Sequence, residues 1–539
     1  MEFNKDVYRE LEDIVGPGYI SSDLAVLEPY SSFGFGSRGP KREDRYFTRP
    51  EAILLPSNTQ EVQAIVKLCN RRGLKFKASS TGYGSRNAAG SKGVIILDMR
   101  RMNRILDIDE KNMCAIVEPY VSFAQLQGEA MKRGLNTHVI GAGSNCSVVA
   151  SFTSFHGTSN QAISHSWSGR NVLGVEWVLP TGDILKLGAQ GIGAGWFSAD
   201  GPGPSMRGIM RGAAGALGGL GVFTKCACHL HPWPGPQEIE IKGISPYYEM
   251  EVPPNFEYHV MEWPTWEKCA DGILKISATG MGYSLQKTGG PGSHGAIVTG
   301  CNNEYFDKWS EYKDIPWISY SLVTAAATPD EHDWQVKTLN RILEDTSGKI
   351  IPVGEIPDFK KRDIINMIKG CFIPRVSFRT AGSFCCPLQG QESIDHAMFG
   401  LSFDKEFRKP YDDKGLLVND GINHMWSVSF EGGHFALFEC GHLYSITDED
   451  SHRAGGQMMM EGNELSIKQP LSIGWTIMGD MAVNKLGPLV GNVQNWQRKI
   501  KIALDPNTAA DPLGYISPEI KDIDYSKVTP FSAPAAEDK

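Results

Sequence analysis

The sequence predicts an α+β protein with a first domain rich in small-residue loops and a second, separate α+β domain. Three observations support this prediction. Short apolar runs around one amphipathic helix form a β-α-β pattern near the start of the first domain. Clusters of small residues occur at 79–90, 141–160 and 212–225, each beside a predicted strand. After Pro236 this clustering falls, and longer mixed segments follow.

The first β-α-β unit has clear boundaries. A strand is expected over 52–55, and a helix begins after Asn58. Asn58 and Glu61 have the spacing of a capping box, in which two side chains satisfy the free amides at a helix start. Gly73 is placed to end this helix. A second strand is expected over 74–78.

The other elements follow from similar patterns. They are a helix over 5–14, strands over 94–97, 105–108 and 114–118, a helix over 122–133, a hairpin over 172–187, and a closing helix over 495–504. The hairpin turns at Pro180-Thr181-Gly182-Asp183.

The composition is that of an ordinary globular protein with an acidic balance. Of 539 residues, 41% are hydrophobic and 21% are charged, and the net charge is -9. The sequence contains no basic stripe that would neutralise phosphates, so nucleic acid is not an expected partner. Without a run of about 18 apolar residues, no membrane span is expected, and the charged N-terminus predicts no secretory signal. Eleven cysteines without paired spacing indicate reduced thiols and a cytoplasmic setting.

The small-residue loops suit a phosphate group or a flat ring, because their backbone N–H groups can be approached closely. None of them reads GxxxxGK[ST], and none reads GxGxxG after the first strand. This disfavours the P-loop and Rossmann types of nucleotide site. A single loop of this kind is equally consistent with an ordinary surface turn.

Several ordered motifs resemble the FAD-binding domain of the vanillyl-alcohol oxidase and p-cresol methylhydroxylase (PCMH) flavoprotein family. They are RPEAILLPSNTQEVQAIVKLCNRRGLKFKASSTGYGSRNAAGSKGVIILDMRRMNRILDID, CAIVEPYVSFAQL, NVLGVEWVLPTGDILKLG and GALGGLGVFTK. WQRKIKIALDPNTAADP resembles that family's closing helix. The resemblance implies an N-terminal extension (1–48), a two-subdomain PCMH-type FAD-binding domain (49–236), an α+β cap, or substrate, domain (237–480) and a C-terminal segment that returns to the FAD domain (481–539).

The resemblance also implies which residues hold FAD. The first loop would hold the pyrophosphate through backbone amides, the second would line the flavin, and the third would lie near the adenine. The implied cofactor-binding residues are Ser79, Ser80, Thr81, Gly82, Tyr83, Gly84, Ser85, Ser147, Ser151, Gly221 and Val222.

Family members with covalent FAD attach it through a His or Tyr of the cap. The matching stretch here is PRVSFRTAGSFCCPLQG, which places Gly382 at the His-type position and Val376 at the Tyr-type position. Neither side chain can form the bond. We therefore predict non-covalent, dissociable FAD, unless His156, His165 or a cysteine is used. Loss of the bond would lower the flavin potential and favour a dehydrogenase.

Tyr83 matches the first of two tyrosines with which phenol-oxidising members bind phenolate. The later Tyr-Arg pair is missing near GWTIMGD, and the family's acidic residue has no match in VIGAGSNCSVV. These departures argue against a p-alkylphenol substrate. Tyr83 is equally consistent with a loop aromatic residue that packs under the flavin.

The segment FEGGHFALFECGHLYS contains two histidines. In a strand, His434 and His442 would share one face and Glu439 would lie on the other. Related 2-hydroxyacid dehydrogenases hold a divalent metal with histidines near here, but the match is loose. We predict no metal and keep His434 and His442 as weak candidates, because satisfied histidines in a cap sheet explain them more simply. His442 could still face the flavin as a base.

The favoured function is an FAD-dependent dehydrogenase that moves a hydride from a hydroxyl-bearing or aromatic small molecule to flavin N5. His156, His442 or Tyr83 would handle the hydroxyl proton. Arg375 and Arg379 suit carboxylate or phenolate recognition, although an ion pair at the surface or between domains would also explain them. The expected acceptor is O2 or an electron-acceptor protein, and the resemblance implies a homo-oligomer, a dimer.

Three alternatives remain open. One is a metal-assisted D-2-hydroxyacid dehydrogenase that uses His434 and His442. Another is a flavin subunit of a larger complex with an Fe–S partner, since the chain has no Fe–S cysteine pattern of its own. A third is non-redox use of FAD, as in a related ether-lipid synthase.

Overall fold

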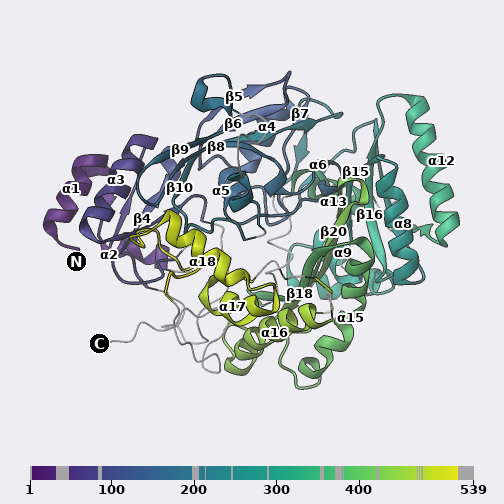
Figure 1. Ribbon diagram of the computed structural model, residues 1–539. Coiled ribbons are helices and arrows are strands. Elements are labelled where there is room, and N and C mark those ends of the chain that lie inside the picture. Colours follow the sequence, from purple (N-terminus) through teal and green to yellow (C-terminus); the bar gives the residue numbers. More distant parts are fainter. Residues whose placement is uncertain are drawn as a thin grey trace.

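The computed structural model describes residues 3–31, 48–82, 88–196, 205–212, 214–244, 247–287, 290–352, 357–370, 379, 381–420, 424–469, 471–472, 474 and 477–519. Within these ranges the chain is an α+β protein, as predicted (Figure 1). The first domain is built mainly on a four-stranded and a five-stranded sheet, and the cap domain mainly on a four-stranded and a three-stranded sheet. No helix of the described part is long and apolar enough to cross a membrane.

The first subdomain is built on a four-stranded sheet in the order β1-β2-β4-β3. Its elements are α1 (Lys5–Val15), β1 (Ile20–Ser21), α2 (Leu24–Leu27), β2 (Ala52–Leu54), α3 (Thr59–Arg72), β3 (Lys75–Ser79) and β4 (Val94–Asp98). The predicted β-α-β unit is confirmed. Asn58 caps α3, and Gly73 ends it with a φ of 63°. Residues 5–31 are part of this subdomain, because β1 pairs with β2 and α1 packs on α3.

The second subdomain is a five-stranded antiparallel sheet in the order β5-β6-β10-β8-β9. Its elements are β5 (Ile105–Asp109), β6 (Cys114–Val117), α4 (Phe123–Met131), β7 (Leu135–Asn136), α5 (Val148–Thr153), α6 (Ala162–His165), β8 (Val172–Val178), β9 (Ile184–Leu187), α7 (Arg207–Met210), β10 (Val222–His229) and β11 (His231–Pro232). The predicted hairpin is confirmed as β8 and β9. The short helices α5, within the second small-residue stretch, and α6, directly after it, were not predicted.

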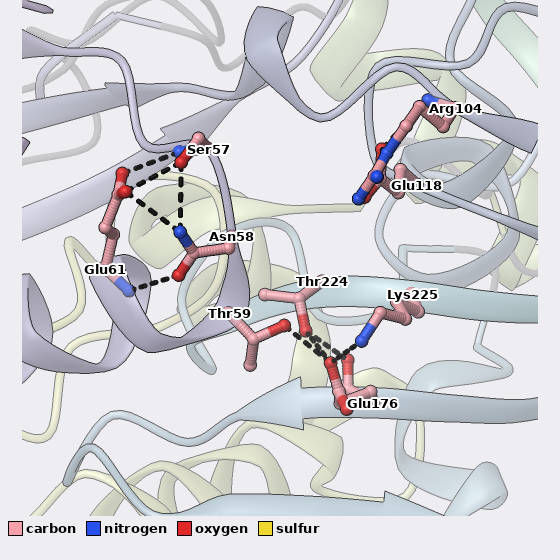
Figure 2. Close-up of polar contacts among 9 residues, drawn as sticks. All are labelled: Ser57, Asn58, Thr59, Glu61, Arg104, Glu118, Glu176, Thr224 and Lys225. Atoms are coloured by element: carbon pink, nitrogen blue, oxygen red, sulfur yellow. Dashed lines mark hydrogen bonds and ion pairs between the residues drawn. The ribbon is translucent and has the colours of Figure 1, made fainter. Parts of the chain in front are cut away.

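A buried carboxylate joins the two subdomains (Figure 2). Glu176 on β8 accepts hydrogen bonds from Thr59 at the start of α3 (2.6 Å), from Thr224 (3.0 Å) and from Lys225 (2.8 Å). These bonds outweigh burial and lower the pKa of Glu176. Figure 2 also shows the capping residues Ser57, Asn58 and Glu61 directly before this contact. The start of α3 is thereby held against the second sheet.

We expect Glu176→Ala to lower the free energy of unfolding by about 1–3 kcal/mol, because the buried Thr59 hydroxyl loses its acceptor and Thr224 keeps only the backbone carbonyl of residue 176 (3.3 Å). Urea unfolding of the purified protein measures this change. Lys186→Ala is the matched control: its ammonium is 47% exposed and lies 3.9 Å from the same carboxylate. An equal loss in both variants would contradict this account.

The main antiparallel sheets of the cap domain have the orders β15-β16-β14-β17 and β18-β20-β19, and β12 and β13 form a two-stranded sheet. Its elements are β12 (Ile241–Lys242), β13 (Glu249–Met250), β14 (Phe256–Glu262), α8 (Trp266–Ala278), β15 (Gly282–Lys287), α9 (Gly290–Val298), α10 (Asn302–Asp307), α11 (Trp309–Tyr312), β16 (Ser319–Ala325), α12 (Pro329–Thr346), β17 (Lys349–Ile350), α13 (Pro357–Lys369), β18 (Phe384–Glu392), α15 (Ile394–Asp412), β19 (His424–Phe430), β20 (Phe435–Leu443) and α16 (Glu449–Lys468).

The C-terminal segment carries α17 (Gly479–Leu486) and α18 (Val493–Leu504) and then runs along the first domain. The buried ammonium of Lys501 donates to Gly219 O (2.7 Å), Ala510 O (2.8 Å) and the Asp505 carboxylate (2.5 Å). Residues 509–511 bond to Phe76 on β3. Residues 501–511 thus lie beside the first and third small-residue loops.

Candidate functional site

The first loop leaves β3 beside the C-terminal segment. Ser79 is buried at the end of β3, Ser80 and Thr81 are partly buried, and Gly82 is exposed with a φ of 78°. The predicted residues Tyr83, Gly84 and Ser85 lie outside the described part of the chain. Beyond them, the amide of Gly90 donates to Asp511 (2.9 Å). Both ends of the loop are therefore anchored.

The second loop leads into α5. Ser147 caps this helix, since its hydroxyl accepts from Ala150 N (3.1 Å) and donates to Pro119 O (2.7 Å). The hydroxyl is thus engaged within the protein, which leaves backbone groups as the means by which this segment would contact a cofactor. Ser151 lies buried on α5.

The third loop meets both others. Gly221 has a φ of 103°, and a Cβ there would lie 2.3 Å from Val178 O, so only glycine fits. Val222 follows and pairs with Val178. Earlier in this loop, Ala216 N donates to Thr153 O at the end of α5 (3.0 Å). A Cβ on Gly218 would lie 3.7 Å from Lys77 of β3. The structure therefore brings the described parts of the three predicted loops together.

Unpaired buried polar atoms beside the second loop are consistent with a bound dinucleotide. Buried polar atoms without a hydrogen-bond partner among the described residues cluster at the end of the second loop and before it: Thr137 Oγ1, His138 Nδ1 and Asn160 Oδ1. Buried polar groups are almost always paired, so these atoms are available to a ligand. The glycine-lined backbone nearby can approach a phosphate without a cationic side chain.

His156 does not have the position of a base. Its Nδ1 lies 2.9 Å from Ser151 O, and its Nε2 contacts Met210 O. Both ring nitrogens therefore face backbone carbonyls. Burial lowers the pKa of His156 to about 4. The ring ties α5 to the end of α7, which replaces the predicted catalytic role with a structural one.

One face of the β19-β20 pair is turned towards the first domain. Val428, Phe430 and Leu437 on that face pack against Ala162 and Trp167 of the first domain. Because side chains alternate along a strand, the residues two positions further on share this face. The helix α6 contacts both cap sheets at the same junction.

Trp426 of β19 and Glu439 of β20 lie on the same face and are cross-strand neighbours. A Cβ on Gly141 of the second loop would lie 2.9 Å from the Trp426 ring, so the ring touches the loop expected to line the flavin. Glu439 is partly buried. Burial raises its pKa to about 7, although a hydrogen bond from Cys386 partly offsets this effect. A carboxyl with this pKa can accept or donate a proton near neutral pH.

His442 lies on the opposite face of β20 from Glu439, so it is not on the face that meets the first domain. Its Nε2 lies 2.9 Å from Asp404 Oδ1 on α15, and both side chains are fully buried. His434 is exposed in the turn before β20 and does not share a strand face with His442. The two weak metal candidates are therefore not brought together. No group of three or more potential metal ligands occurs among the described residues. The strand alternation that separated Glu439 from His442 in the sequence is confirmed.

Arg379 caps a cap-domain helix. Its guanidinium donates to Thr299 Oγ1 (2.7 Å), Thr299 O (2.5 Å) and Ala296 O (2.8 Å) at the end of α9. These bonds satisfy helix carbonyls that have no partner within the helix. The predicted role of Arg379 in substrate recognition is thus replaced by a structural one. Arg375 and Val376 lie outside the described residues.

Sequence reasoning missed the residues that dock the cap. Three side-chain amides of the first domain bind the last carbonyls of α13: Gln127 Nε2 to Ile368 O (3.0 Å), Asn160 Nδ2 to Asn366 O (3.0 Å), and Gln161 Nε2 to Met367 O. Their only sequence signal is the presence of amides next to small residues. They fix the end of α13 at the second loop.

Comparison with known proteins agrees with this arrangement. The FAD binding domain family matches residues 50–188. D-lactate dehydrogenase of Anaerostipes hadrus is 29% identical over 39% of this chain and 43% of its own length. The 4-cresol dehydrogenase [hydroxylating] flavoprotein subunit of Pseudomonas putida is 28% identical over 43% of each chain. The matched segments thus span about two fifths of these relatives.

The whole fold also has a solved counterpart. The structure of p-cresol methylhydroxylase with substrate bound superposes with a TM-score of 0.71, at 16% identity, over 94% of this chain and 95% of that one. The chain therefore has the fold of a flavoprotein with an FAD-binding domain and a cap. Residues 50–188 match the FAD binding domain family, the type of domain that the sequence motifs predict.

Proposed function

We propose that the protein is an FAD-dependent dehydrogenase acting on a hydroxyl-bearing aromatic small molecule, with Glu439 as the proton acceptor. The observation that carries the proposal is the pair of Trp426 and Glu439 on the cap face that meets the second loop. An indole ring beside a carboxyl suits a flat substrate with an ionisable hydroxyl.

Each described part has a role in this proposal. Bound FAD would accept the two electrons of the reaction. Backbone amides from residue 79 onwards bind its pyrophosphate, and the second and third loops hold the remainder. Glu439 takes the hydroxyl proton as the substrate carbon gives up its hydride. Trp426 orients the substrate ring, and the docked end of α13 helps to exclude water.

An aromatic substrate is favoured over a 2-hydroxyacid by two observations. The guanidinium of Arg379 is engaged by the end of α9 and does not offer a carboxylate site. His434 and His442 lie too far apart along the chain and the sheet to share a metal. Relatives named for D-lactate and for 4-cresol match similar shares of the chain, so sequence identity does not decide between them.

A substrate screen tests the proposal. The purified holoprotein is mixed without oxygen with aromatic alcohols, phenols and D-2-hydroxyacids, and bleaching of the flavin absorption band is followed. We expect bleaching by an aromatic alcohol or phenol and none by D-lactate or glycolate. A protein that contains no FAD, or one that only the hydroxyacids bleach, would contradict it. Reoxidation by O2, compared with an artificial one-electron acceptor, then identifies the acceptor class.

We also expect the FAD to be non-covalent. Gly382 offers no side chain for a bond, and Val376 is aliphatic. Acid precipitation should therefore release the whole flavin into the supernatant and leave a protein pellet without flavin fluorescence. Fluorescence that stays with the denatured chain on a gel would show that another side chain is attached.

A further inference from the structure

Within the described part of the chain, the thiol of Cys386 donates a hydrogen bond to the Glu439 carboxylate. The two atoms, Cys386 Sγ and Glu439 Oε2, are 3.9 Å apart. Burial and the nearby carboxylate raise the pKa of the Cys386 thiol well above its usual value. The thiol therefore stays protonated near neutral pH and acts as a donor, a weak one.

The position of Cys386 depends on an irregularity in the sheet. Cys385 pairs with His442 and Leu388 with Cys440, so β18 contains one residue more than β20 over this interval. Such a bulge can turn a side chain towards a site. Cys385 packs in a hydrophobic cluster on the face of the sheet that points away from the first domain. Cys386 instead contacts Glu439, on the face that is turned to the first domain. Pro387, which has no N–H to offer a ladder, is tolerated at this bulge.

A glycine of β20 lies beside the thiol. Gly441 lies next to Cys386 on β20, and a Cβ there would lie 3.9 Å from Cys386 Sγ and 3.0 Å from His424 Cβ. His424 shares this face of β19, and the Asp420 carboxylate lies 3.4 Å from its Nε2. Gln389 and Trp426, the direct neighbours of Glu439 across the two ladders, carry no charge.

We propose that Cys386 is a positioning residue, whose thiol donates to the Glu439 carboxylate, orients it towards the first domain and stabilises its ionised form. This inference depends on the proposed function only for the role of Glu439 as proton acceptor. Loss of the thiol leaves the carboxylate without this donor, so Glu439 should bind its proton more tightly.

Infrared titration of the holoprotein tests this proposal without any substrate. The protonated-carboxyl band that Glu439→Gln removes is followed against pH in each variant. We expect Cys386→Ala to raise the midpoint of that band by about half a unit to one unit, since one weak hydrogen bond to a charged group is lost. Cys386→Ser keeps a donor and should keep the midpoint close to that of the unsubstituted protein.

Cys385→Ala is the matched control, because the adjacent thiol faces the other side of the sheet and should leave the midpoint unchanged. An unchanged midpoint in Cys386→Ala, or an equal shift in Cys385→Ala, would overturn the proposal. The pH profile of flavin reduction by the compound found in the substrate screen should shift in parallel. If Glu439→Gln reduces the flavin normally, the proposed function fails while the infrared result still decides the role of Cys386.

Discussion

Replacement of Glu439 by glutamine is expected to slow substrate reduction of the bound flavin by about 10²- to 10⁴-fold, the usual contribution of a positioned proton acceptor. Glutamine keeps the size and polarity of the side chain but cannot accept the hydroxyl proton. The rate in the unsubstituted protein should rise with pH through about 7, where Glu439 ionises. This limb of the pH profile should be absent in the variant.

Stopped-flow reduction without oxygen measures the rate, and the flavin absorption spectrum verifies that FAD is bound. Glu392→Gln is the matched control, because Glu392 is exposed at the end of β18 in the same sheet. Reduction at the original rate in Glu439→Gln would assign proton transfer to another group. A comparable loss in Glu392→Gln would indicate a general effect on the sheet.

Acidification from pH 6.5 to pH 4 is expected to remove a large part of the stability. Burial lowers the pKa of His138, His156 and His294 to about 4, whereas an unfolded histidine titrates near 6.5. In this window the unfolded chain binds protons that the folded chain does not. The stabilisation is complete above pH 6.5 and falls as the pH falls towards 4. At about 1.4 kcal/mol per pKa unit, each histidine contributes at most about 3 kcal/mol.

A second group reinforces this acid sensitivity. The rings of His165 and His231 stack at 4.2 Å, and that of His229 lies 4.4 Å from His231. Burial and mutual repulsion lower the pKa of His165 and of His231 well below 6.5. His165 also packs edge-on against Tyr283 of the cap, so protonation would disturb the junction of the two domains.

Urea unfolding at pH 7.5, 6.5, 5.5 and 4.5 measures the effect. The free energy of unfolding should fall more steeply below pH 6.5 in the unsubstituted protein than in His138→Gln, which carries one buried histidine fewer. His434→Gln, at an exposed site, should follow the original curve. A free energy that is flat between pH 6.5 and 4.5 would contradict the prediction.

The capping box at Asn58, the stop at Gly73 and the turn at Pro180 were readable from the sequence. Each depends on residues a few positions apart. The small-residue loops were also visible, because their composition marks backbone that must be approached closely. The alternation that put Glu439 and His442 on opposite faces followed from the strand period of two.

What the sequence by itself determined was therefore the order of the elements, the family and the relative faces of neighbouring residues, since local spacing dictates all three. The tertiary structure alone decided which face of β20 meets the first domain, and so selected Glu439 over His442. It also assigned Arg379 to the end of α9 and His156 to Met210. These outcomes depend on contacts between residues that are distant in the chain, and on one bulge that turns Cys386, and no local pattern records either.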